Sequence, residues 1–103
     1  MSEEQIECHV RKGLVIFEGK WNTCVLYELI KAPSRRFGEL RKAIPPISNT
    51  MLTSTLRELE KQGLVSREQF NEIPPHVEYS LTESGRAIIP VFDAIEHWSK
   101  EYL

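Results

Sequence analysis

The stretch between Ile47 and Arg67 predicts a helix whose two faces differ in chemistry. Leu52, Leu56 and Leu59 recur at the spacing of one helix face, and such a stripe has to lie against a core. The opposite face is polar but almost uncharged, and it carries Asn49, Thr50, Thr53, Ser54 and Arg57. A face that only contacts water is usually rich in Lys and Glu, which are strong helix formers. The pattern therefore fits either a capped surface helix or a helix whose polar face recognises something.

The segments on either side fix the bounds of this helix. Ser48 is a typical N-cap, and Gly63 is the residue type that ends a helix by turning left-handed, so the helix should run to about Gln62. Before it, Phe37, Leu40 and Ile44 predict a short helix, which is closed by two prolines at positions 45 and 46. The two helices are thus joined by a short turn.

Two further helices are predicted near the N-terminus. The first is short and stops near Gly19, because Val10, Leu14, Phe17 and Trp21 follow helical spacing. The second opens at Trp21 and ends at Pro33, with its buried face built from Val25, Leu26, Leu29 and Ile30.

After Gly63 the pattern changes to strands. Residues Leu64–Phe70 and Val77–Leu81 predict two short strands, since Val77, Tyr79 and Leu81 alternate with polar residues. The loop between them contains Pro74 and Pro75, so the pair predicts a hairpin with a stiff, exposed tip.

The C-terminal segment predicts a last helix that is capped by Thr82 and kinked near Pro90. Its apolar residues are Ile88, Val91, Phe92, Ile95, Trp98 and Tyr102, and all of them except Phe92 follow a heptad spacing. So much apolar surface on a terminal helix needs a partner. A two-fold related copy of the chain is the simplest one, and packing against its own domain is the alternative.

Length and composition limit the class of protein. At 103 residues the chain is expected to form one domain, residues 1–103, and it has no apolar run near the roughly 20 residues that span a bilayer. The first residues are acidic and polar, unlike a signal peptide, so we expect a cytoplasmic protein without a membrane partner. Two cysteines are too few for a disulfide framework or a Cys-based zinc site, and no metal or cofactor is expected.

The formal net charge of −2 conceals an uneven distribution. Residues 31–67 hold eight basic and three acidic side chains, a net charge of +5, while the rest of the chain holds five basic and twelve acidic ones. The positive charge therefore surrounds the helix with two faces. A local basic surface attracts phosphates whatever the total charge is, which favours a nucleic-acid partner.

The predicted order of elements is that of a winged helix-turn-helix domain, mainly α with a small β-hairpin wing. Seven segments in order also resemble the HxlR (DUF24) family of transcription regulators, which is related to MarR proteins. They are Gly19–Trp21, Arg36–Arg41, Ile47–Ser48 with Met51–Thr53, Leu56–Glu60, Gly63–Val65, Pro74–Tyr79 and Leu81–Gly85. The resemblance extends from Cys8 to Trp98.

The resemblance implies a homodimer on double-stranded DNA with a pseudo-palindromic operator. Its N- and C-terminal helices would form the dimer interface, two recognition helices would enter successive major grooves, and the wings would reach the flanking backbone or minor groove. The interface residues expected on this basis are Val10, Leu14, Phe17, Ile88, Val91, Phe92, Ile95, Trp98 and Tyr102.

The residues themselves suggest how DNA would be bound. Base contacts are expected from the N-terminal half of the recognition helix, because Asn suits adenine and Thr methyl groups suit thymine. The candidates there are Ser48, Asn49, Thr50, Thr53, Ser54 and Arg57, with Arg57 suited to a phosphate as well. The candidates for backbone contacts are Arg35, Arg36, Lys42 and His76, although each of these could equally be a solvated side chain.

Two departures from the family pattern bear on binding. Many members carry a basic residue just after the position of Ser48 and an Arg at the position of His76. Here Asn49 and a titratable His76 stand instead, and Glu68 and Glu72 make the wing more acidic. Weaker or more pH-dependent DNA binding than in relatives is the expectation.

The two cysteines receive different predictions. Cys8 should lie just before the first helix, beside His9, Arg11 and Lys12, where cations and a helix N-terminus would both stabilise a thiolate. In the resembled family a Cys at this position often senses oxidants or electrophiles; a redox sensor and a non-sensing Cys are both open here. Cys24 is expected against the core.

Two rival functions were weighed. An enzyme is disfavoured because the sequence has no phosphate-binding glycine loop and no zinc-protease pattern, and its three histidines form no recognisable triad with the cysteines. A winged helix that binds another protein is the second alternative. It should expose apolar anchors on the helix with two faces, and this chain exposes Asn, Thr and Ser there.

Overall fold

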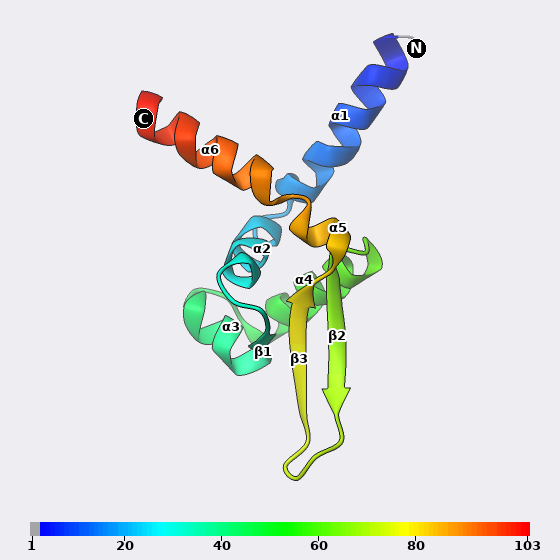
Figure 1. Cartoon of the computed structure of the whole chain (residues 1–103), viewed down its shortest axis with the longest axis vertical. Helices are drawn as coiled ribbons and strands as arrows, with labels where there is room; N and C mark the ends of the chain where they lie inside the picture. The colour runs from blue at the N-terminus through cyan, green and yellow to red at the C-terminus, as the bar shows by residue number, and fades with distance from the viewer. Residues whose placement is uncertain (1–2) are drawn as a thin grey trace.

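A compact body and two projecting helical arms make up the computed structural model, which describes residues 3–103, with side chains from residue 8 onward (Figure 1). The arms are α1 (Glu3–Glu18) and α6 (Ile89–Tyr102), and they leave the body in different directions. The body contains α2 (Asn22–Ile30), α3 (Phe37–Ala43), α4 (Asn49–Lys61) and a small sheet. None of the described helices is long and apolar enough to cross a membrane.

The sheet has three antiparallel strands in the order β1, β3, β2. Strands β2 (Val65–Phe70) and β3 (His76–Leu81) form the predicted hairpin, which extends away from the body as a wing (Figure 1). The third strand, β1 (Arg35–Arg36), was not predicted; it pairs Arg35 with Tyr79 and Arg36 with Glu78. The segment that leads into α3 therefore pairs with the middle of β3 and holds the wing there.

The core lies where α2, α3 and α4 meet the base of the sheet. Its most deeply buried side chains are Val25, Leu26, Leu29, Leu40, Leu52, Leu56 and Leu59. All three leucines of the predicted apolar stripe in α4 are among them, which confirms the orientation of that helix. Ile44 and Ile47 are buried on either side of the turn between α3 and α4, so the turn is held against the core.

The bounds of α4 follow from its caps. The Ser48 hydroxyl accepts a hydrogen bond from the Met51 backbone N–H at 3.1 Å, as expected of an N-cap. Gly63 has a φ of 78°, in the left-handed region that favours glycine, and it follows directly after the C-cap. Both predictions for this helix are confirmed.

The single kinked C-terminal helix was a wrong prediction, because two helices occupy this segment. The Thr82 hydroxyl caps α5 (Glu83–Arg86) by accepting from the Gly85 N–H at 3.0 Å, and α6 begins after a break at Ala87 and Ile88. Pro90 lies in the first turn of α6, where its missing N–H costs no helical hydrogen bond. Gly85 is buried, and a Cβ there would lie 2.1 Å from the Leu64 carbonyl oxygen, so α5 packs directly onto the backbone that precedes β2.

Both cysteine positions differ from the predictions. Helix α1 begins at Glu3, so Cys8 lies inside the helix rather than before it, and the helix N-terminus does not act on its thiol. Cys24 is exposed on α2 instead of packing against the core. Its neighbour Val25 takes the buried position, so the apolar stripe of α2 begins one residue later than Cys24.

Candidate nucleic-acid interface

The exposed face of α4 presents amide and hydroxyl side chains beside a basic segment of the fold. Its side chains line an open hollow of about 560 Å³ that runs along the helix. The lining residues are Asn49, Thr50, Thr53, Ser54, Arg57, Glu58 and Lys61. Five of the six residues predicted to read bases therefore lie together on one surface, and the sixth, Ser48, caps the same helix.

Helix α3 and the turn after it present cations next to this face. Arg36, Arg41 and Lys42 are exposed on or just before α3. The Arg36 N–H donates to the Glu39 carboxylate at 2.9 Å, which fixes the start of α3 while leaving the Arg36 guanidinium outside that bond. The shorter helix and its start thus present three cations, while the first half of the longer helix presents neutral polar groups and its second half adds Arg57 and Lys61.

Arg35 occupies a different environment from Arg36. Its guanidinium lies 3.6 Å from the Glu28 carboxylate, and its Nε is buried without a hydrogen-bond partner in the described part of the chain. Lys31, the C-cap of α2, also contacts the Glu28 carboxylate, at 2.9 Å. Of the two adjacent arginines predicted to contact DNA, Arg36 is therefore the exposed one.

The wing contains a hydrogen-bonded group that the sequence analysis did not predict. The Ser34 hydroxyl donates to one oxygen of Glu78 at 2.7 Å, and the His76 ring contacts the other at 2.9 Å. His76 also stacks on Phe70, with ring centroids 4.7 Å apart, and its side chain is only 15% exposed. The structure thus places this candidate DNA contact inside the wing's own network, at the hairpin's end distant from α4.

This network predicts a specific pH dependence of stability. The Ser34 hydrogen bond and then the His76 contact hold the pKa of Glu78 below its ordinary value of 4.5. A carboxylate with a lowered folded-state pKa stabilises the fold above its unfolded-state pKa, and this contribution is lost as pH falls through the folded-state value. We expect wild type to unfold at higher urea than Glu78→Gln at pH 6, and this difference to shrink steadily below pH about 4.5. A difference that is unchanged at pH 3 would contradict the assignment.

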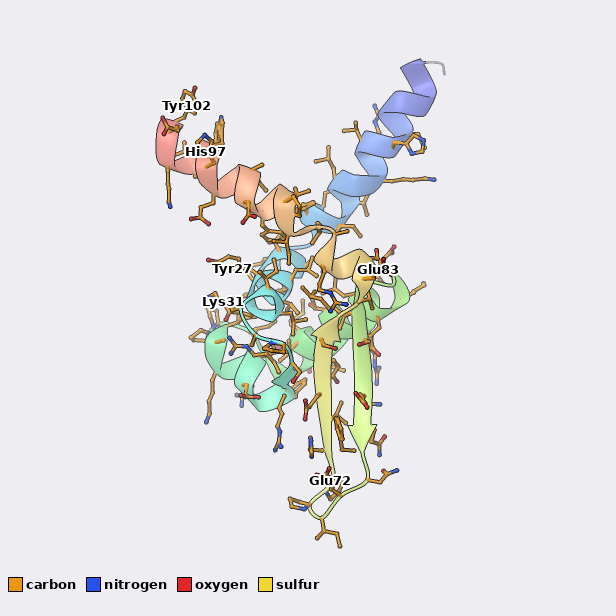
Figure 2. The ribbon with its side chains drawn as sticks, in the orientation of Figure 1. Tyr27, Lys31, Glu72, Glu83, His97 and Tyr102 are labelled. Carbon is orange, nitrogen blue, oxygen red and sulfur yellow. The ribbon has the colours of Figure 1, made fainter. Side chains whose placement is uncertain are left out.

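The apolar residues predicted for a dimer interface fall into two groups. Phe17, Ile88 and Phe92 are half-buried within the chain; the Phe17 and Phe92 rings lie 5.8 Å apart, and Ile88 and Phe92 pack on the core. The other six are exposed along the two arms, and they are Val10, Leu14, Val91, Ile95, Trp98 and Tyr102. Figure 2 shows Tyr102 near the free end of α6, far from the wing.

No group of three or more His, Cys, Asp or Glu side chains is arranged to hold a metal ion among residues 8–103, whose side chains are described. The hollow along α4 is lined by amide, hydroxyl and guanidinium groups, together with one carboxylate and one ammonium group. These are the groups that bind phosphates and the edges of bases.

Comparison with known proteins identifies the family. The model of the HxlR-like helix-turn-helix family matches residues 16–103, which include α2 to α6 and the wing. The chain belongs to the HxlR-like helix-turn-helix family. An uncharacterised HTH-type transcriptional regulator of Methanothermobacter thermautotrophicus is 45% identical over 102 residues, covering 99% of this chain and 77% of the relative. YdeP of Bacillus subtilis, another regulator of this type, is 46% identical over 92% of this chain and 73% of its own length.

Solved structures agree with this family membership. A chain from Porphyromonas gingivalis W83, assigned to the MarR family of transcriptional regulators, has a TM-score of 0.84 and 43% identity, covering 100% of this chain and 98% of that one. The redox regulator HypR in its oxidised form has a TM-score of 0.82 and 41% identity, covering 93% and 98%. The winged helix-turn-helix fold expected from the sequence is thereby confirmed.

Within this HxlR-like fold, sequence reasoning missed two side chains near α4. Arg67 on β2 and Tyr79 on β3 are cross-strand partners, and both line a cleft between the sheet and α4. The signal was present, because Arg67 follows the buried Val65 by two residues and so falls on the same face of the strand. The alternation of the strand thus places this cation on the side that meets α4.

Proposed function

We propose that this HxlR-like protein is a sequence-specific DNA-binding transcriptional regulator that acts as a homodimer. The observation that carries the proposal is the neutral polar face of α4, which is exposed on the longer helix of a helix-turn-helix while the opposite face is buried. Amide and hydroxyl side chains at that place suit base edges in a major groove. Asn49, Thr50, Thr53 and Ser54 are the proposed base contacts, and Arg36 and Lys42 the proposed backbone contacts.

The dimer is supported by the exposed apolar residues on the two arms. Helix α6 has no buried residue in the single chain, yet it carries Val91, Ile95, Trp98 and Tyr102. A second copy related by two-fold symmetry would cover this surface and α1 together. Two recognition helices would then read half-sites about 34 Å apart, or a multiple of that distance, on a pseudo-palindromic operator.

In vitro selection of bound DNA from a random duplex library tests the proposal directly. The expected result with reduced protein is enrichment of one two-fold symmetric sequence, with binding that weakens steeply as salt increases. Enrichment of no sequence, together with no retention of DNA in a gel shift at 50 mM salt, would rule out this function.

Control by thiol oxidation is the second part of the proposal. Cys8 is exposed on α1, the arm that also carries Val10 and Leu14, and the similar protein HypR is named a redox regulator. A disulfide at Cys8, either to the partner's Cys8 or to a small thiol, would change the contacts of this arm. In that step two thiols join as a disulfide and their two hydrogens reduce the oxidant.

Treatment with diamide tests whether Cys8 is a redox sensor. The N=N bond of diamide takes up the two hydrogens. We expect diamide to lower the affinity of the wild-type protein for DNA by at least about tenfold, and a reducing agent to restore binding. Cys8→Ser should keep its affinity under the same treatment, whereas Cys24→Ser, the matched control, should respond as wild type does. Release of DNA from Cys8→Ser by diamide would exclude Cys8 as the sensor.

A further inference from the structure

A polar cleft separates α4 from the sheet of the wing. It has a volume of about 390 Å³ and is lined by Thr53, Leu56, Arg57, Glu60, Arg67 and Tyr79. Thr53 and Arg57 also line the hollow along the exposed face of α4, so the cleft opens onto the proposed base-reading surface. Figure 1 shows α4 near the base of β2 and β3, and these two strands contribute Arg67 and Tyr79 to the lining of the cleft.

Two guanidinium groups line this cleft. Arg57 comes from α4 and Arg67 from β2, and neither side chain makes a hydrogen bond or an ion pair with any residue that the structure describes. The Tyr79 hydroxyl, on the strand opposite Arg67, is likewise without a partner within residues 8–103. Glu60 is the single acidic residue of the lining, so the cleft has a net positive charge. Two arginine forks beside a hydroxyl are suited to a phosphate group.

The geometry of DNA identifies the source of that phosphate. If α4 lies in a major groove and the wing reaches the adjacent minor groove, one sugar-phosphate strand separates the two grooves and has to cross between helix and wing. We propose that a backbone phosphate of this strand binds in the cleft, held by Arg57 and Arg67 with the Tyr79 hydroxyl as a third donor. The inference rests on the proposed DNA-binding function, and it assigns Arg57 to the backbone instead of a base.

A single neutralised phosphate tests the proposed contact. The probe is the duplex obtained by selection, made as a series in which one phosphate at a time is replaced by an uncharged methylphosphonate. Wild type should lose about tenfold in affinity at one position in each half-site, as expected for a charge-assisted hydrogen bond. Arg67→Gln should bind unmodified DNA about tenfold more weakly or worse and should be insensitive to the substitution at that position. Its salt slope should fall by about 1 for each half-site.

The controls separate this inference from the proposed function. Lys100→Gln removes a positive charge from α6, far from the cleft, and should retain the wild-type sensitivity at every position. Circular dichroism and thermal unfolding establish whether Arg67→Gln is folded; if it is not, Arg57→Gln, on the opposite wall, has to show the same insensitivity. An arginine variant as sensitive as wild type at every phosphate would overturn the inference and leave base reading by α4 intact. A wild-type protein that binds no DNA would overturn both.

Discussion

Replacing Leu56 by alanine is expected to lower the free energy of unfolding by about 2–5 kcal/mol. Leu56 is 1% exposed in the centre of α4, where it contacts the core shared by α2 and the sheet. Removing three carbon atoms there leaves a cavity that close-packed neighbours cannot fill. Urea unfolding followed by circular dichroism measures the change, and a loss below about 1 kcal/mol would show that this helix face is not the buried one.

The matched control is an alanine on the other face of the same helix. Asn49 is exposed at the start of α4, so Asn49→Ala should alter stability by no more than about 0.5 kcal/mol. The same variant should weaken binding to the selected operator by about 1–3 kcal/mol and relax the preference at one base pair of each half-site. Affinity and specificity equal to wild type would remove Asn49 from the base contacts.

The second large effect is expected from Trp98→Ala. Trp98 is 53% exposed on α6, and its ring lies tilted beside that of Tyr102, with centroids 6.2 Å apart. A two-fold dimer contains two copies of Trp98. A loss of about 2 kcal/mol of binding free energy at each tryptophan therefore weakens dimerisation by about 1000-fold. Because separate monomers also lose the advantage of binding two linked half-sites, affinity for the operator should fall by at least about 100-fold.

Sedimentation at several protein concentrations measures this change in assembly. The control is His97→Ala, the neighbouring residue on the polar side of α6, where Asp93, Glu96 and Lys100 share a shallow hollow with it. It should associate as wild type does. If Trp98→Ala remained a dimer at nanomolar concentration, α6 would have to be removed from the proposed interface.

Helix α4 was predictable because its signals are local. Leu52, Leu56 and Leu59 specify a helix face by spacing alone, and Ser48 and Gly63 mark its ends through backbone chemistry. Strand β1, by contrast, has only two residues, which is too short to express an alternating pattern. In α5, Gly85 approaches the Leu64 carbonyl oxygen so closely that a Cβ would clash, and this tertiary contact is one that spacing does not encode.

The start of α1 was missed for a related reason. Its first residues, Glu3 to Glu7, carry almost no apolar residues, so a method that follows apolar spacing begins the helix too late. The error then placed Cys8 before the helix, whereas it lies in the second turn of α1. For the wing, alternation along β3 places His76 and Glu78 on one face, and their contact could have been anticipated from that spacing.

Helices α1 and α6 leave the body in different directions, so most of the surface of α6 is not covered by its own chain (Figure 1). An arm with no buried residue of its own gains most of its helical stability only when another surface covers it. Ordering of α6 and association of two chains are then one coupled equilibrium, so the fraction of ordered arms rises with protein concentration. On the proposed function, a fall in the number of copies would disorder the arms before the DNA-reading body loses its fold, and abundance itself would become an input to regulation.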